Sequence, residues 1–333
     1  MPAKRGLAFL GGKAFTADAK STIASGVYVE GGRIRAVGHH DEMKKLLPAD
    51  TRIVDIQGKT LVPGFIDAHN HLPSQGASLT GVDFRYPQVA SIEDLAKAVA
   101  LAAEDTPPGQ WIRGSGMDYG KYPEGRMPTR WDIDPVSGDH PVSIGHVSGH
   151  FALMNTLALE QAGITDSTPD PKGGKLVRDE GGRVTGMLLD AAMQMVERGA
   201  VDVGNHGPAL GYQASIQELV EDIDRACRAF HQEGITSVVD PQVTRREMPA
   251  YLEARTQGRL GVKTTCMFLS NHLTDVKALG LAGDLGDPWL SVGPMKFYCD
   301  GSLIGCTAAF YSPYQNQSDN LGYTFWSPEE LKA

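Results

Sequence analysis

Two histidines separated by a single residue are the feature of the sequence that points most directly to chemistry. His69 and His71 end residues 61–71, where an apolar run leads straight into the pair. If this stretch is an extended strand, its side chains alternate between two faces, so Asp67, His69 and His71 share one face. Two imidazoles roughly 6–7 Å apart on one face can bind the same divalent metal ion. The alternative is a half-buried strand whose histidines are only hydrogen-bonded, because so short a motif often occurs by chance.

A lysine in an apolar stretch is the second candidate. Lys296 lies within residues 292–298, which the pattern predicts as a strand, and Asp300 and Ser302 follow it. A buried ammonium group is costly unless it is paired, neutral or chemically modified. A neutral lysine can react with carbon dioxide to give a carbamate, which is an anionic oxygen ligand. The alternative is an ion pair with a nearby Asp or Glu.

A second histidine pair, His146 and His150, has the i, i+4 spacing of a helical metal site. Ser148 and Gly149 between them favour a loop instead. We therefore expect these two histidines to line a substrate pocket or to have a structural role.

The elements that must position these residues begin with a strand-rich segment. Residues 1–62 contain short runs rich in β-branched and aromatic residues, and the pair Gly31-Gly32 is typical of a two-residue hairpin turn. The segment predicts a small β-sandwich lobe with one helix at residues 41–47. Strands are expected at 6–10, 13–15, 26–30, 33–37, 51–55 and 60–62.

Residues 63–333 have the pattern of a larger α/β domain. A long mixed region covers about residues 75–210, with a capped helix from residue 91, strands near 111–114 and 141–145, and a loop at 167–182. Strands and helices then alternate, which is typical of a parallel sheet. Reactive groups in an α/β barrel lie at the C-terminal ends of its strands. The alternating elements are expected at 212–232, 235–239, 248–256, 262–269, 272–280 and 292–298, and Asp240 follows the second of them.

Composition narrows the classes of partner. The 333 residues are 41% hydrophobic and 21% charged, and the net charge is −9. An acidic chain is a poor ligand for nucleic acid or an anionic membrane. No apolar run approaches the roughly 20 residues of a membrane helix, and the N-terminal apolar run is too short for a signal peptide. Four cysteines without CxxC spacing predict reduced thiols in a cytoplasmic protein.

With these residues in place, the chain resembles the metal-dependent amidohydrolase superfamily, in the branch that includes N-substituted formamide deformylase. The likeness covers nearly the whole chain. It rests on residues 61–71, on Gly149-His150 with Asn155, on residues 234–240 and on residues 295–302.

The resemblance implies a fold and a set of site residues. The fold is a distorted (β/α)8 barrel, of TIM type, with a β-sandwich built from both chain ends and a large insertion after the first barrel strand. His69, His71 and Lys296 are the implied ligands of one or two divalent ions, expected to be zinc, with Lys296 carboxylated between them. Lys296 and Asp300 are the implied catalytic residues, and the substrate-pocket residues are His146, His150 and Ser302.

The implied reaction is hydrolysis of a carbon–nitrogen bond other than a peptide bond, in an amide or an N-acyl or N-formyl amine. Metal ions lower the pKa of a bound water to near neutrality, and the resulting hydroxide attacks the carbonyl carbon. The expected partner is a small amide-like molecule, with neither nucleic acid nor membrane, and self-association is left open.

Two departures from the family pattern leave alternatives open. First, such enzymes take further histidine ligands and a general-base aspartate from later strands, and this sequence is expected to end before those strands. Second, residues 303–306 differ from those of many relatives. Ser327, Pro328 and Glu330 begin a helix only just before the last residue, so the chain is expected to be part of a longer protein. The alternatives are a catalytically incomplete fragment or pseudoenzyme with a binding role, and an isomerase or lyase on the same scaffold.

Overall fold

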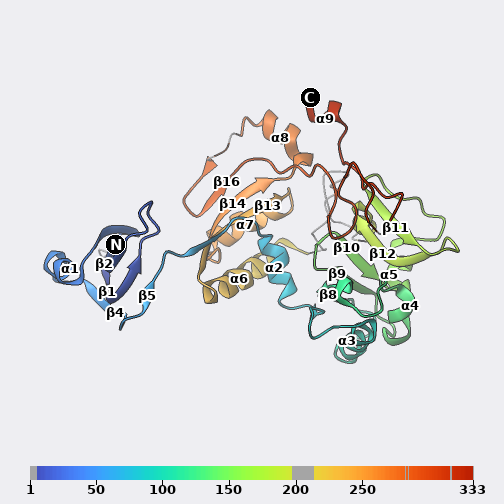
Figure 1. The fold of residues 1–333 in the computed structure, drawn as a ribbon, viewed down its shortest axis with the longest axis horizontal. Coiled ribbons are helices and arrows are strands. Elements are labelled where there is room, and N and C mark those ends of the chain that lie inside the picture. Colours follow the sequence, from blue (N-terminus) through green and yellow to red (C-terminus); the bar gives the residue numbers. More distant parts are fainter. Residues whose placement is uncertain (1–5, 197–213, 282, 284, 316, 333) are drawn as a thin grey trace. The chain divides into compact units, whose positions relative to one another are not determined.

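The computed structural model (Figure 1) describes residues 6–196, 214–281, 283, 285–315 and 317–332. The chain divides into two compact units, residues 1–65 and residues 66–333. Both helices and strands occur in the chain, which confirms the mixed α/β class.

The first unit forms one sheet with a short helix. Its strands have the order β3-β2-β1-β4, and β5 pairs with the far part of β1. Gly31 and Gly32 have φ angles of +58° and +75°, the left-handed values that the predicted hairpin turn requires. The elements are β1 (Leu7–Phe15), β2 (Ile23–Glu30), β3 (Arg33–Gly38), α1 (His40–Leu46), β4 (Arg52–Asp55) and β5 (Thr60–Leu61).

Two details of this unit bear on the predictions. Strands predicted on either side of Gly11 and Gly12 are one strand, because β1 continues through both glycines with a shift of register after Leu10. Residues 6–64 contribute a single sheet, with Ala8, Leu10, Tyr28 and Met43 buried on it. The β-sandwich, which needs a second sheet, stays a prediction.

A six-stranded sheet occupies the first part of the second unit. Its order is β11-β12-β10-β9-β8-β7, with β7, β8 and β9 parallel and the remaining neighbours antiparallel. The predicted strands near 111 and 141 are confirmed as β8 and β9. The strands are β7 (Val82–Asp83), β8 (Ile112–Met117), β9 (Val142–His146), β10 (Phe151–Met154), β11 (Gly174–Arg178) and β12 (Val184–Asp190).

The loop predicted at residues 167–182 is wrong in part, because β11 lies inside it. Leu176 is buried, and β11 pairs with the fully buried strand β12. The Pro, Gly and Asp residues that flank this short strand hid it in the composition of the whole stretch.

A second sheet carries the strand ends on which the site depends. Its order is β15-β16-β14-β13-β6, and β13, β14 and β16 are parallel, as the alternating pattern predicted. The strand predicted at residues 292–298 is wrong in its extent, since β16 ends at Val292. Gly293 and Pro294 follow, and proline has no N–H to continue a ladder. The strands are β6 (Phe65–Asp67), β13 (Ile235–Val243), β14 (Lys263–Phe268), β15 (Leu285–Gly286) and β16 (Leu290–Val292).

Helix α6 is the longest helix of this unit within the described residues. It begins at Ile216, where Ser215 and Glu218 form a capping box. The predicted start at residue 212 lies outside the described residues. Gly234 follows its end with φ +76°, which confirms the predicted stop. The helix packs against α2 and α7. One face of it is buried, formed by Leu219, Val220, Ile223, Ala226, Cys227 and Phe230.

The remaining helices of the second unit are shorter than α6. The capped start predicted at Ser91 is confirmed, because its side chain accepts a hydrogen bond from Asp94 N at 3.0 Å. No helix in the described ranges is long and apolar enough to cross a membrane. These helices are α2 (Leu72–Ser78), α3 (Ile92–Asp105), α4 (Arg130–Ile133), α5 (Thr156–Ala162), α7 (Glu247–Thr256), α8 (Leu273–Ala278) and α9 (Pro328–Lys332), with 3₁₀ turns at Tyr119–Lys121, Asp134–Val136, Ala191–Met195 and Ser270–His272.

Candidate metal centre and substrate cavity

A cavity of about 630 Å³ in the second unit collects most of the predicted site residues. His69 and His71 line it together with His150, Lys296 and Asp300. They come from three places in the chain: the segment after β6, the turn between β9 and β10, and the segment after β16. The other lining residues are Val147, Ser148, Gly149, Phe297, Tyr298, Cys299 and Gly301.

The imidazoles of His69 and His71 lie side by side, but not for the predicted reason. The strand ends at Asp67, so an extended strand reaching His71 is wrong. The carboxylate of Asp67 accepts hydrogen bonds from His69 N at 3.1 Å and from Asn70 Nδ2 at 3.0 Å, which forms a local turn directly after the strand. The two ring centroids are 5.5 Å apart with the rings nearly perpendicular.

A buried carboxylate orients one of these rings. Asp240 on β13 is 1% exposed, and its Oδ1 lies 3.3 Å from His71 Nδ1. Tyr251, which is fully buried on α7, donates its hydroxyl hydrogen to Asp240 Oδ2 at 2.5 Å. Burial raises the pKa of the Tyr251 hydroxyl well above its ordinary value, so it stays a donor. An imidazole whose Nδ1–H is held by a carboxylate presents its Nε2 lone pair to a ligand.

Lys296 reaches the cavity from an irregular segment. Its backbone continues the edge of β14 for one residue, since Lys296 N donates to Phe268 O at 2.8 Å and Ser270 N donates to Lys296 O at 2.9 Å. Its ammonium nitrogen lies 4.4 Å from the centroid of the Tyr298 ring. Within the described residues no carboxylate forms an ion pair with it, and burial lowers its pKa.

The donor set fits a divalent metal ion. Imidazoles that share one tetrahedral ion have ring centroids roughly 5 Å apart, close to the spacing of His69 and His71. Burial lowers the pKa of His69, and the charges of His71 and Lys296 act in the same direction, which favours the neutral, metal-binding imidazole. Across the described ranges, no group of three or more His, Cys, Asp and Glu side chains is placed to hold a metal, and Lys296 lines the same cavity as the two histidines.

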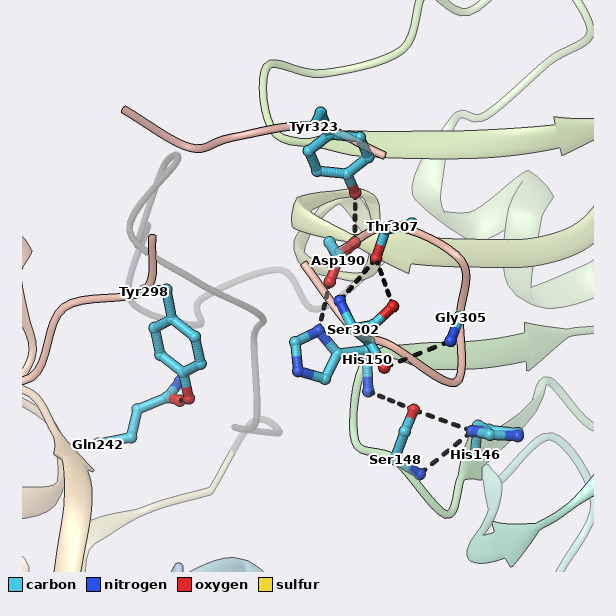
Figure 2. A network of polar contacts seen from close by, with 10 residues as sticks. All are labelled: His146, Ser148, His150, Asp190, Gln242, Tyr298, Ser302, Gly305, Thr307 and Tyr323. Carbon is cyan, nitrogen blue, oxygen red and sulfur yellow. Dashed lines mark hydrogen bonds and ion pairs between the residues drawn. The ribbon is translucent and has the colours of Figure 1, made fainter. Parts of the chain in front are cut away.

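His150 also lines the cavity and has a buried partner of its own. Its Nδ1 lies 2.6 Å from Oδ1 of Asp190, which is 0% exposed. The hydroxyl of Tyr323 donates to the other oxygen of Asp190. The ring of His150 makes an edge contact with that of Tyr298, at 6.3 Å between centroids, and the Tyr298 hydroxyl donates to Gln242 Oε1 at 2.5 Å (Figure 2).

Two predicted pocket residues do not line this cavity. His146 is buried between Tyr119 and Phe151, and its Nδ1 accepts a hydrogen bond from Ser148 N at 3.1 Å. Burial lowers its pKa to about 4, so the ring is neutral. Its Nε2 has no hydrogen-bond partner among the described residues, and the side chain borders a separate cavity of about 560 Å³.

Ser302 lies in a tight turn beside the cavity. The hydroxyl of Thr307 accepts a hydrogen bond from Ser302 N at 2.8 Å (Figure 2). Ser302 O also accepts a hydrogen bond from Thr307 N at 3.0 Å. The turn closes against Phe151, because a Cβ at Gly305 would meet that ring at 1.6 Å. Asp300 does line the cavity, and its Oδ2 accepts a hydrogen bond from Ala309 N at 3.0 Å.

Sequence reasoning missed the groups that hold the histidines. Asp240 was recognised only as a strand end, and Tyr251, Asp190 and Tyr323 were not identified as site residues. Asp190 does carry a signal, because it ends a fully buried apolar strand and a buried carboxylate needs a partner. The sequence does not say which of the ten histidines that partner is.

Comparison with known proteins points to one family. The model of the amidohydrolase family matches residues 52–332 of the chain. N-substituted formamide deformylase of Arthrobacter pascens is 30% identical over 350 residues, a match that covers 99% of this chain and 60% of that protein. Protein LONG AFTER FAR-RED 3 of Arabidopsis thaliana is 32% identical over 334 residues, which covers 96% of this chain and 54% of that protein.

Solved structures give a consistent result. An uncharacterized metal-dependent hydrolase of Pyrococcus horikoshii OT3 has a TM-score of 0.70 and 26% identity, with 98% of this chain and 61% of that one covered. A corresponding hydrolase of Pyrococcus furiosus has a TM-score of 0.68 and 25% identity, with 98% and 63% covered. The chain spans between 54% and 63% of the length of these four proteins.

Proposed function

The chain belongs to the amidohydrolase family, as its sequence predicted, and on this premise we propose that it hydrolyses carbon–nitrogen bonds other than peptide bonds. The proposed substrates are small amides, or N-acyl and N-formyl amines. The observation that carries the proposal is the pair of adjacent imidazoles, one of them held by the buried carboxylate of Asp240. The name of the Arthrobacter relative gives independent support for the substrate class.

We further propose that the metal is zinc, as one or two ions, held by His69, His71 and Lys296. When bound, such an ion supplies Lewis acidity, which polarises a carbonyl group and lowers the pKa of a water molecule. Asp240 fixes the direction of the His71 ring. A carbamate on Lys296 would add a negative charge in a cavity where burial already disfavours the ammonium form.

Asp300 keeps its predicted catalytic role in this proposal, because its carboxylate lines the same cavity. The barrel fold is proposed from the parallel order β16-β14-β13 and from the solved metal-dependent hydrolases. We also propose a domain boundary between residues 62 and 63 and an insertion at about residues 75–210. A cytoplasmic location with reduced cysteines, and self-association, are further proposals.

The experiment combines metal analysis with a substrate panel. Purified protein is loaded with zinc, dialysed and assayed for metal content and for amine release from a series of N-formyl and N-acyl amines. We expect bound zinc and release of amine from at least one member. The double variant His69→Ala/His71→Ala should lose both properties.

A matched control is His39→Ala, since His39 is an exposed histidine of the first unit. It should behave as wild type. Metal retained in full by the double variant would contradict the ligand assignment. Bound metal with no turnover of any substrate would favour the alternative of a binding protein.

A further inference from the structure

His150 makes a shorter contact with a carboxylate than His71 does at the same cavity, at 2.6 Å against 3.3 Å. The proposed metal ligands do not include His150, so the proposed metal site does not explain this contact. Asp190 is fully buried, and both of its carboxylate oxygens are occupied, one by His150 Nδ1 at 2.6 Å and the other by the Tyr323 hydroxyl (Figure 2). The backbone N–H of Asp190 also donates to His150 O at 2.7 Å. Two contacts therefore join the turn that carries His150 to the end of β12, and a third joins Asp190 to Tyr323.

The backbone of Asp190 is strained, which supports a functional reading. Its φ of +50° and ψ of −121° lie outside the regions that L-residues prefer. Such strain is unfavourable and persists where surrounding contacts enforce it, most often at functional sites. Here the strained residue places a buried carboxylate against an imidazole on the cavity wall.

The contact with Asp190 decides which nitrogen of His150 carries a proton. A carboxylate accepts, so the proton lies on Nδ1 and Nε2 of the neutral ring is an acceptor. Nε2 has no hydrogen-bond partner among the residues that the structure describes. The side chain is 17% exposed and lines the cavity shared with His69, His71 and Lys296. A rigid acceptor therefore faces the space where a substrate would bind.

We propose that His150 Nε2 accepts a hydrogen bond from the N–H group of a secondary amide, so that the protein prefers N-monosubstituted amides to N,N-disubstituted ones. Asp190 and Tyr323 are positioning residues that act through His150. This inference rests on the proposed function, because it names the substrate class of the same cavity. Val147 and Phe297, which are 53% and 41% exposed and line the cavity, suit an apolar N-substituent.

Binding tests the inference separately from hydrolysis. Zinc-loaded protein is titrated with N-propylacetamide and with N-methyl-N-propylacetamide at pH 8.5, where imidazole side chains are ordinarily uncharged. One neutral hydrogen bond corresponds to a preference of about 5- to 10-fold in Kd. Wild type should show this preference for the N–H ligand, and His150→Ala should bind both ligands equally.

Two conservative variants guard against simple misfolding. His150→Gln retains a carbonyl acceptor and should recover part of the preference. Asp190→Asn should lower the preference while the metal content stays at the wild-type level. The inference is overturned if wild type binds the two amides equally, if it binds neither, if His150→Ala keeps the preference, or if His150→Ala loses metal.

The same samples show whether the proposed function holds. Amine release from the corresponding formamides reports hydrolysis, which does not depend on the ratio of the two Kd values. A preserved N–H preference without amine release would support the inference and contradict the hydrolase. Amine release with no N–H preference would support the proposed hydrolase function and contradict the inference about His150.

Discussion

Two hydrogen-bonded triads hold imidazoles at the same cavity, and both consist of a tyrosine, an aspartate and a histidine. They are Tyr251–Asp240–His71 and Tyr323–Asp190–His150. They differ in what supports the carboxylate. Asp240 lies within β13 and is paired in register with Cys266 of β14. Asp190 lies at the end of β12 with a strained backbone, and its contact with histidine is shorter, at 2.6 Å against 3.3 Å.

This difference suggests that the same Tyr–Asp–His arrangement orients one histidine for a metal ion and the other for a substrate. His71 lies beside a second imidazole, so its orientation serves a shared ligand such as a metal ion. His150 lines the same cavity with no imidazole in ring contact among the described residues, so its orientation serves a single hydrogen bond. If this reading is correct, changes on the Asp240 side should affect metal content, and changes on the Asp190 side should affect ligand preference.

The largest effect is expected at Lys296, on the metal side of the comparison. Lys296→Ala should lower turnover on the order of 1000-fold and weaken zinc retention, because the anionic ligand that we propose at Lys296 would be absent. Short carboxylic acids added to the assay should restore part of the activity. Lys296→Arg should not recover it, since a guanidinium group stays charged and cannot be carboxylated. Metal content and turnover of the three proteins are the measurements, and full activity in Lys296→Ala would reduce the lysine to a structural residue.

Substitution of the two aspartates tests the comparison directly. Asp240→Asn should lower zinc affinity about 10- to 100-fold, because the orienting partner of a metal-binding imidazole is lost. Asp190→Asn should leave zinc affinity unchanged. Competition with a chelator of known affinity measures both. Equal losses in the two variants would show that the cavity does not divide its histidines between metal and substrate.

Much of the metal side could be predicted from the sequence, and little of the other side could. His69 and His71 are two residues apart, so their proximity is local, even though an Asp67 turn produces it and not strand alternation. Lys296 was found from its apolar surroundings, although β16 ends four residues before it. The partners of the second arrangement are 40 and 133 residues apart, and Asp240 is 169 residues from His71. Pairings of that separation depend on packing, which periodicity and capping patterns do not specify.

The fold shows the same contrast between features set by neighbouring residues and features set by contacts between distant residues. Hairpin glycines, capping residues and alternating elements were predicted because each depends on neighbours in the chain. The short strand β11 and the early end of β16 were missed, since the first needed its partner β12 to form and the second depended on Gly293-Pro294 within an apolar run.

His146 sharpens the contrast with His150, its partner in the predicted pair. Burial lowers the pKa of His146 to about 4, below the ordinary value of 6.5. The unfolded chain therefore binds more protons than the folded protein between these values, and the folded protein loses stability as the pH falls through this window. Between pH 7.5 and pH 5.0 the loss from this group is about 2 kcal/mol.

Urea unfolding at the two pH values measures this loss. Other groups contribute in the same way to wild type and variant, so the test is the difference between them. His146→Gln should show about 2 kcal/mol less acid destabilisation than wild type, whereas the exposed His39→Gln should match wild type. An identical pH response in His146→Gln would mean that His146 does not titrate in the unfolding reaction.

The smallest effects on function are expected at Tyr251 and Tyr323, the tyrosines of the two hydrogen-bonded triads. Tyr251 is fully buried, so Tyr251→Phe leaves a buried oxygen of Asp240 without its donor and should lower the free energy of unfolding by about 2 kcal/mol. Tyr323 is only half-buried, so water can replace its hydroxyl, and Tyr323→Phe should lower it by about 1 kcal/mol. Urea unfolding measures both, and Tyr314→Phe, which removes a hydroxyl that donates to Ala308 O, is a control away from either carboxylate. If Tyr323→Phe proved the more damaging, the strained Asp190 would depend on its tyrosine more than the strand-borne Asp240 does. The support for His150 would then come from the Tyr323 segment as much as from the end of β12.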